Sequence, residues 1–204
     1  MNQFDQRART WDINPIHWDR SSAIAGKMKQ YLKLPTNQTA LEYGAGTGIL
    51  SFLLKDSLKE ITLMDNSMEM VRVMEEKIKD EQVAHLKPLF FNLEETAYQG
   101  KNFDLVFTQM VLHHVGDVKS ILAKFYDLLT INGHLVIADL YPEDGSFHGS
   151  DFTGHLGFDV ENLSQTLLQI GFKNIRHEPC FVMKKQTESH GIKEFPVFFL
   201  IATK

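Results

Sequence analysis

Short apolar runs alternate with helical patterns along most of the sequence, and this alternation constrains the fold more than any other feature. Five runs have the composition of strands: residues 39–43, 60–65, 86–93, 103–111 and 135–141. Helical spacing of apolar residues is found between them, and before the first of them at residues 18–34. Because the strand-like runs are apolar throughout, both faces of the sheet must be covered, which is typical of parallel sheets. We therefore expect an α/β fold.

The alternation of strand-like runs with helical patterns ends after residue 141. Residues 142–158 (PEDGSFHGSDFTGHLGF) read as a long loop, and residues 159–172 as a helix that ends at Gly171. Two late strands are expected at 175–185 and 195–204, joined by a polar turn. They predict a hairpin at the edge of the parallel sheet. No repeat or linker divides the chain, so we expect residues 1–204 to form a single domain with an N-terminal helical arm at 1–38.

Composition excludes several classes of protein. The formal net charge of the 204 residues is -5 and the pI is near 6.0, without the basic surplus that a nucleic-acid-binding surface needs. Cys180 is the only cysteine, so no intramolecular disulfide and no cysteine-based metal site can form. The first 20 residues do not resemble a signal peptide, and no apolar run is long enough to span a membrane. A cytoplasmic protein is expected.

The first strand-like run leads into a turn that contains three glycines within five positions, Gly44-Ala45-Gly46-Thr47-Gly48. Glycine allows positive φ angles and lets a ligand approach the bare backbone. In open parallel sheets, ligands bind at the carboxyl ends of the strands, most often at this first turn. Asp65 ends the second strand, where a carboxylate reaches the ribose hydroxyls of a bound nucleoside. A nucleotide-type ligand is therefore expected.

Two residues beside the turn distinguish between nucleotide ligands. The dinucleotide fingerprint requires a glycine where this chain has Ile49. Glu42 precedes the turn, where an acid can bind a cationic amine directly or through water, whereas an anionic pyrophosphate would gain nothing from it. The turn thus favours a ligand that carries an amine over a dinucleotide.

The motifs LEYGAGTG (41–48), FNLEE (91–95), FDLVFTQMVLHHVGD (103–117) and GHLVIADL (133–140) make the sequence resemble the class I S-adenosylmethionine-dependent methyltransferases. Within them it is similar to the small-molecule enzymes of the ubiquinone and menaquinone methyltransferase-like group. The resemblance implies a Rossmann-like seven-stranded sheet, mostly parallel, with helices on both faces and an antiparallel last strand. It implies S-adenosyl-L-methionine as cofactor. The cofactor-binding residues that it indicates are Glu42, Gly44, Ala45, Gly46, Asp65, Asn66, Asn92, Leu93, Glu94, Thr108 and Gln109.

The resemblance also implies methyl transfer to an oxygen, nitrogen or carbon atom of a small-molecule acceptor. Because positioning alone accelerates such a reaction, no nucleophilic side chain is required. His113 and His114 are the candidate bases, since imidazole titrates near neutral pH. The loop at 141–158 holds acids and histidines without the spacing of a metal motif, so no metal is predicted there. A loop of this length is expected to lie over the substrate.

Two other functions remain open from the sequence. One is an NAD(P)-dependent oxidoreductase on a related sheet, which Ile49 disfavours. The other is a non-catalytic protein that binds S-adenosylmethionine and regulates a partner. Neither the loop nor the arm carries a pattern that identifies the methyl acceptor.

Overall fold

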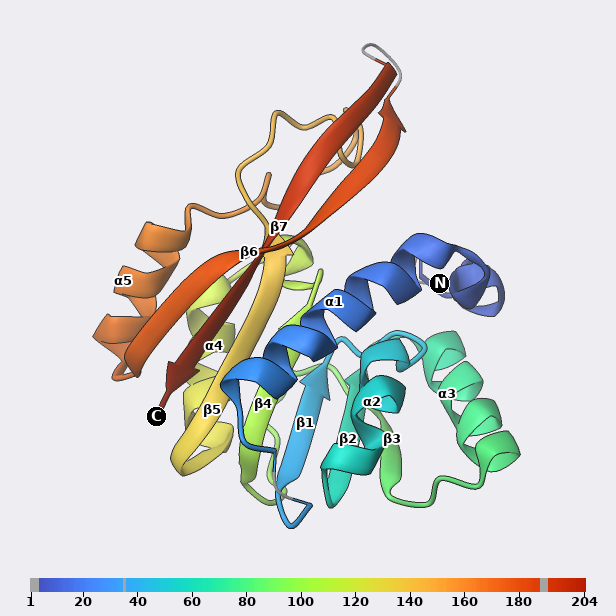
Figure 1. Ribbon diagram of the computed structural model, residues 1–204, viewed down its shortest axis with the longest axis vertical. Coiled ribbons are helices and arrows are strands. Elements are labelled where there is room, and N and C mark those ends of the chain that lie inside the picture. The colour runs from blue at the N-terminus through green and yellow to red at the C-terminus, as the bar shows by residue number, and fades with distance from the viewer. Residues whose placement is uncertain (1–3, 35, 188–190) are drawn as a thin grey trace.

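The protein is described from a computed structural model for residues 4–34, 36–187 and 191–204 (Figure 1). A seven-stranded sheet lies at its centre, with strand order β3-β2-β1-β4-β5-β7-β6. The strands are β1 (Thr39–Tyr43), β2 (Glu60–Asp65), β3 (Leu86–Phe90), β4 (Phe103–Gln109), β5 (Leu129–Leu140), β6 (Lys173–Thr187) and β7 (Gly191–Thr203). The helices are α1 (Pro15–Tyr31), α2 (Ile49–Leu54), α3 (Met68–Glu81), α4 (Val118–Leu128) and α5 (Val160–Ile170). Short 3-10 helices, η1 to η3, lie at Ala8–Ile13, Lys55–Ser57 and Leu112–His114.

The sheet confirms the expected topology. β1 pairs in parallel with both β2 and β4, and β4 pairs in parallel with β5. The last strand, β7, inserts antiparallel between β5 and β6. The chain runs outward from β1 to β2 and β3, then returns to place β4 on the other side of β1. This reversal of strand order puts the expected ligand crevice at the carboxyl ends of β1 and β4.

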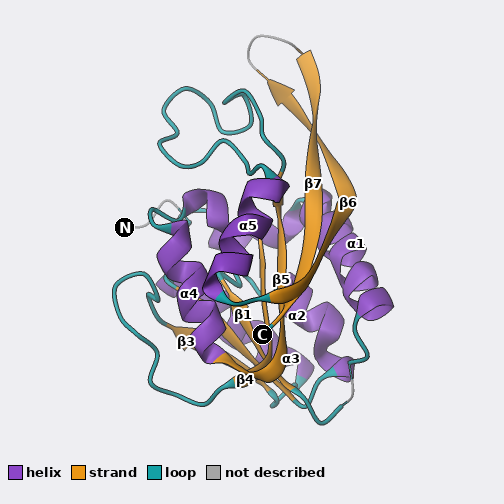
Figure 2. Ribbon diagram, turned by 90° about the vertical axis from the view of Figure 1, so that its left-hand side faces the viewer, coloured by secondary structure: helices purple, strands orange, loops and turns teal. Residues whose placement is uncertain are grey.

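Helices cover both faces of the sheet, and each face has its own apolar core. One core joins α1, α2 and α3 to the sheet through side chains such as Met28, Leu50 and Phe199. The other joins α4 and α5 to the opposite face through Phe125 and Phe198. Phe198 and Phe199 are neighbours in the sequence, yet they belong to different cores, because successive side chains of a strand point to opposite faces. Figure 2 shows the helices on either side of the edge-on sheet.

The start of α1 differs from the sequence prediction for a local reason. Helix α1 begins at Pro15 rather than residue 18, because the side chain of Asn14 accepts a hydrogen bond from the Ile16 N–H and proline suits the first helical position. Helix α3 begins at Met68, directly after Ser67, whose side chain accepts a hydrogen bond from the Met70 N–H. Both helices thus start where a side chain satisfies an otherwise unpaired backbone donor.

The C-terminal hairpin is longer than the sequence predicted. Residues 186–194 were expected to form a polar turn, but strand pairing of β6 with β7 continues to Thr187 and Gly191, and residues 188–190 lie outside the described chain. Cross-strand contacts such as the ion pair of Lys184 with Glu194, 3.1 Å apart, support the polar part of the ladder. The hairpin projects beyond the sheet (Figures 1 and 2) and forms one side of the site described below.

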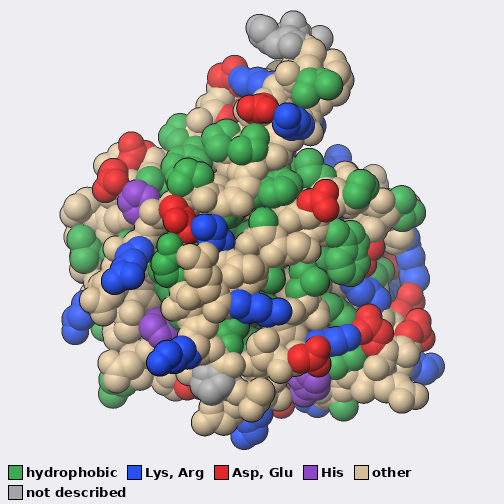
Figure 3. Space-filling view, in the orientation of Figure 1, with side chains coloured by type: hydrophobic (Ala, Val, Ile, Leu, Met, Phe, Trp, Pro, Cys, Tyr) green, Lys and Arg blue, Asp and Glu red, His purple; other side chains and the backbone are tan. Residues whose placement is uncertain are grey.

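The surface seen in Figure 3 carries basic and acidic side chains intermixed, with no area of a single sign dominating this face. Within the described residues, no helix has the length and apolar character needed to cross a membrane.

The packing of Phe199 yields a test of the sheet's role in stability. Phe199 is 1% exposed in the α1–α3 core, so Phe199→Ala is expected to lower the free energy of unfolding by about 3 to 5 kcal/mol. Val182 on the neighbouring strand is 44% exposed, so Val182→Ala is the control and should change it by less than about 1 kcal/mol. Urea denaturation measures both, and equal effects of the two substitutions would contradict the assignment.

Candidate functional site

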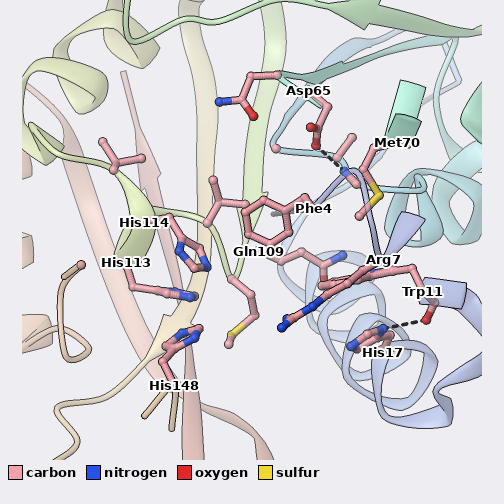
Figure 4. Close-up of a pocket in the computed structure, with 18 of the residues that line it drawn as sticks. Phe4, Arg7, Trp11, His17, Asp65, Met70, Gln109, His113, His114 and His148 are labelled. Carbon is pink, nitrogen blue, oxygen red and sulfur yellow. Dashed lines mark hydrogen bonds between the residues drawn. The ribbon is translucent and has the colours of Figure 1, made fainter. Parts of the chain in front are cut away.

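A cavity of about 1480 Å³ opens at the carboxyl ends of β1 to β4 (Figure 4). The glycine turn, Asp65 and residues 91–94 line one side of it. Residues 109–116, the loop after β5 and residues 183–185 of the hairpin line the other side, and the N-terminal arm contributes residues from Phe4 to Arg20. The cavity therefore lies at the point where the strand order reverses, as expected for this type of sheet.

The glycine turn presents bare backbone to the cavity. Gly44 and Gly46 have φ angles of +67° and +59°, in a backbone region that residues other than glycine rarely adopt. A Cβ atom on Gly44 would lie 2.5 Å from Cγ2 of Val111, whereas one on Gly46 would meet no atom within 4 Å. Gly44 is thus required by packing against the loop after β4, and Gly46 leaves room for a ligand. Ala45 also lines the cavity.

Asp65 ends β2 beside this turn and ties it to the start of α3. Its carboxylate accepts hydrogen bonds from the Gly46 N–H at 2.7 Å and the Ser67 N–H at 2.8 Å. The side chain lines the cavity, although the residue is only 9% exposed. Burial raises the pKa of the Asp65 carboxyl to about 6, and the backbone donors that favour its ionised form offset part of this effect.

Two of the predicted cofactor-binding residues lie outside the cavity lining. Glu42 is fully buried beneath the turn, where its Oε2 accepts a hydrogen bond from Ser51 Oγ of α2. Burial raises the pKa of Glu42 to about 8. Thr108 is 1% exposed and donates its hydroxyl to the carbonyl of Tyr43. In this geometry, both residues support the strand ends and do not form the wall that a ligand touches.

The remaining predicted residues are brought to the cavity. Asn66 lies beside Asp65, and Gln109 at the end of β4 accepts a hydrogen bond from Ser21 of α1 at 3.0 Å. The loop after β3 contributes its part of the lining through Asn92, Leu93 and Glu94. Glu94 Oε2 accepts from the Gly116 N–H at 3.1 Å, which joins this loop to the loop after η3. The structure thus gathers residues from three strand ends that are far apart in the sequence.

Both predicted histidines reach the cavity, but their surroundings differ. His113 is 1% exposed, and its Nδ1 lies 2.6 Å from Oδ1 of Asp139, a fully buried carboxylate at the end of β5. His114 is partly exposed, and its ring contacts Phe4 with centroids 5.2 Å apart. Burial lowers the pKa of His114 to about 4. His148, from the loop after β5, lies next to both rings (Figure 4).

Arg20, a buried cation of α1 that lines the cavity, was not among the residues predicted from the sequence. Arg20 is 5% exposed, and within the described residues its Nε has no hydrogen-bond partner. Burial lowers the pKa of its guanidinium to about 10, so the group stays charged near neutral pH. One signal was present in the sequence: Arg20 precedes Ile24 and Met28 at four-residue intervals, so it continues the buried stripe of α1.

Comparisons with known proteins agree with this geometry. Residues 41–137, which include the glycine turn, Asp65 and both adjacent histidines, match the family model described as a methyltransferase domain. Over this segment, 97 of the 204 residues, the chain is similar to methyltransferase domains. The ubiquinone-like subgroup is not specifically indicated by these matches.

Relatives and solved structures extend the match beyond the family model. An uncharacterized methyltransferase of Schizosaccharomyces pombe is 30% identical over 122 residues, which are 56% of this chain and 43% of that protein. The chain therefore spans less than half the length of this curated relative. An S-adenosylmethionine-dependent methyltransferase from Aquifex aeolicus has the same fold, with a TM-score of 0.69, 15% identity and coverage of 98% and 97% of the two chains.

A second similar structure was determined with S-adenosylhomocysteine bound. Phosphoethanolamine N-methyltransferase 2 of Haemonchus contortus, in complex with phosphomonomethylethanolamine and S-adenosylhomocysteine, aligns with a TM-score of 0.71 and 17% identity. The alignment covers 92% of this chain and 52% of that one. At this identity the likeness establishes the fold of the methyltransferase domain.

The buried acid beneath the turn predicts a pH-dependent stability of the methyltransferase domain. Because the pKa of Glu42 is 4.5 when unperturbed and about 8 when folded, its stabilising contribution is present below pH 4.5 and is lost as the pH rises to about 8. Glu42→Gln removes this titration. As the pH rises from about 5 to about 8, the free energy of unfolding of the wild type should therefore decrease relative to that of the variant.

Denaturation at a series of pH values measures this difference. Glu75 is exposed on α3, so Glu75→Gln is the matched control. Its free energy of unfolding should differ from that of the wild type by the same amount at every pH. If the curves of the wild type and Glu42→Gln run parallel over the whole range, Glu42 does not titrate as its burial requires.

Proposed function

We propose that the protein transfers the methyl group of S-adenosylmethionine to a small-molecule acceptor bound in the cavity. The observation that carries the proposal is the combination of the open glycine turn with the carboxylate of Asp65 at the same cavity wall. A carboxylate accepts two hydrogen bonds from a ribose diol, and the open backbone at Gly46 admits a ligand beside it. This donor and acceptor set fits a nucleoside with an amino-acid tail.

The chain's own groups would hold the cofactor as follows. Asp65 and Asn66 would bind the ribose, and Asn92, Leu93 and Glu94 would bracket the adenine ring. Gly44, Ala45, Gly46 and Gln109 line the adjoining part of the cavity and would contact the methionine part. Glu42 and Thr108 act through the turn and the strand ends, because neither reaches the cavity.

When bound, S-adenosylmethionine would supply a methyl group on a positively charged sulfur, and the sulfur would leave with the bonding electron pair as the acceptor atom bonds the methyl carbon. The protein's contribution is alignment of acceptor and methyl group, which supplies roughly 7 to 11 kcal/mol in well-oriented systems. Where the acceptor carries a proton, His113 or His114 accepts it. His113 is the better placed, because Asp139 holds its Nδ1 and leaves Nε2 for the cavity.

The acceptor side of the cavity favours an anionic molecule. Its lining includes four basic side chains: Arg7, Arg20, Lys184 and Lys185. Asp151 is the one carboxylate that the loop at 141–158 adds to this lining. A guanidinium as buried as Arg20 is costly unless its donors are satisfied, and a carboxylate or phosphate of the acceptor would satisfy them. We therefore propose that this loop, the arm and the hairpin together select the acceptor.

Substitution of the acid at the end of β2 tests cofactor binding. Asp65→Asn removes the charge that accepts the ribose hydroxyls, so the affinity for S-adenosylhomocysteine is expected to fall roughly 10- to 100-fold in calorimetry. The exposed Asp80→Asn on α3 is the matched control, and the melting temperature of each ligand-free variant checks folding.

The same titrations separate the two rival functions. Tight binding of NAD without any response to S-adenosylmethionine would replace the proposal with an oxidoreductase. Confirmed binding of S-adenosylmethionine without methyl transfer to any acceptor in cell-extract metabolites would instead favour a regulator.

A panel of acceptors tests the proposed substrate class. Formation of S-adenosylhomocysteine is expected with acceptors that carry a carboxylate or phosphate and not with neutral amines or alcohols of similar size. With an active acceptor, Arg20→Met should raise KM with little change in kcat, because it removes binding that the ground state and transition state share. Lys29→Met, an exposed substitution on the same helix, should leave both constants unchanged. Equal turnover of neutral acceptors would overturn the assignment.

A further inference from the structure

Three histidines converge on the acceptor side of the cavity. His113 and His114 belong to η3, and His148 comes from the loop after β5 (Figure 4). One ring nitrogen from each residue lies within 4.8 Å of the corresponding nitrogens of the other two. We propose that His113, His114 and His148 bind one divalent transition-metal ion of the zinc type, with a remaining coordination position open to the cavity.

The chemistry of the three side chains suits such an ion. Imidazole nitrogen is a preferred ligand of zinc, and three histidines with an open fourth position are one of its catalytic arrangements. Nitrogens around a tetrahedral zinc ion stand about 3.4 Å apart, so the three rings need to draw together only slightly. His148 lies in a loop between Gly145 and Gly149, where a small backbone adjustment can supply this movement.

The nitrogens that would bind the ion are not engaged elsewhere. Within the described residues, the rings of His114 and His148 have no hydrogen-bond partner, and His113 uses only Nδ1. Each of the three rings therefore has a nitrogen available to an ion.

Asp139 supplies the feature that separates a metal site from simple ring packing. Its Oδ1 accepts from the Leu140 N–H at 2.8 Å and lies 2.6 Å from Nδ1 of His113. A fixed carboxylate on the far nitrogen of a histidine orients the ring and strengthens it as a ligand, as metal sites commonly require. Phe152 stacks on His148 with centroids 4.0 Å apart and restricts that ring as well. Asp139 is thus a positioning residue for the proposed site.

A bound ion would change how the acceptor is activated. The three histidines would then hold the ion instead of taking a proton, and the ion would lower the pKa of an acceptor hydroxyl or thiol bound at the open position. The acceptor's proton would pass to solvent, and the resulting anion would be the methyl acceptor. Only this step rests on the proposed methyl transfer, and ion binding does not.

Metal titration of the full chain, purified without a histidine tag and stripped with a chelator, tests the site. Calorimetry with Zn²⁺ is expected to show one tight site per chain, and Co²⁺ should give the intense visible absorption of a four- or five-coordinate ion. Mg²⁺, which prefers oxygen ligands, should give no response. A water-like six-coordinate Co²⁺ spectrum, or no tight site, would overturn the proposal.

Variants assign the ligands. His148→Ala should weaken Zn²⁺ binding at least about tenfold, and Asp139→Asn by about 10- to 100-fold with an altered Co²⁺ spectrum. His177→Gln removes an imidazole outside the cavity that pairs with Glu161, and it should bind Zn²⁺ as the wild type does. Equal Zn²⁺ affinities of His148→Ala and His177→Gln would overturn the proposal. Because His148 lies in a loop, His148→Ala is not expected to misfold, so a loss of Zn²⁺ affinity would reflect the loss of a ligand.

The test of metal binding can fail independently of the test of the proposed methyl transfer. S-adenosylhomocysteine is titrated into the stripped protein, where Asp65 and the glycine turn are expected to bind it without the ion. Failure of that binding would count against the proposed function alone, whereas failure of the metal titration would count against the histidine site alone.

Discussion

Parallel pairing of β1 with β2 on one side and β4 on the other is the constraint on which the rest of the structure depends. It brings three strand ends to one edge, and the reversal of chain direction at β1 leaves that edge uncovered. The hydrogen bond from Gly46 to Asp65, 2.7 Å long, links the turn after β1 to the end of β2. This arrangement places the glycine turn, Asp65 and Gln109, and the pairing of β3 with β2 adds the loop that holds residues 92–94.

The two halves of the cavity are built differently. The half proposed to bind the cofactor stands on the sheet, supported from below by Glu42 and Thr108, which bond to α2 and β1. The half proposed to bind the acceptor is made of the N-terminal arm, the loop after β5 and the projecting hairpin. Lys185 on the hairpin donates to the Phe147 carbonyl of the loop, and Asp12 of the arm pairs with Lys77 of α3 at 2.7 Å. One half of the cavity is thus built on paired strands, and the other is assembled from segments that are far apart in the sequence.

Sequence reasoning succeeded where local rules decide the outcome. The strands, the inserted antiparallel strand and the position of the glycine turn followed from periodicity, glycine spacing and the family resemblance. It could not foresee burial: the carboxylate of Glu42 was expected at the ligand, and the structure places it beneath the turn, bonded to Ser51 of α2. Arg20 and His148 carried no recognisable motif, because residues far apart in the chain complete their surroundings.

The sequence by itself determined the parallel sheet, the bare backbone at Gly44 and Gly46, and the acid at the end of β2, because each depends on periodicity or on residues near one strand end. Only the tertiary structure decided which polar groups face the cavity and which lie beneath it. It also brought His148 next to His113 and His114, and Asp139 behind His113. These contacts arise where separate strand ends, a long loop and a hairpin meet, and no local pattern records the distance between them.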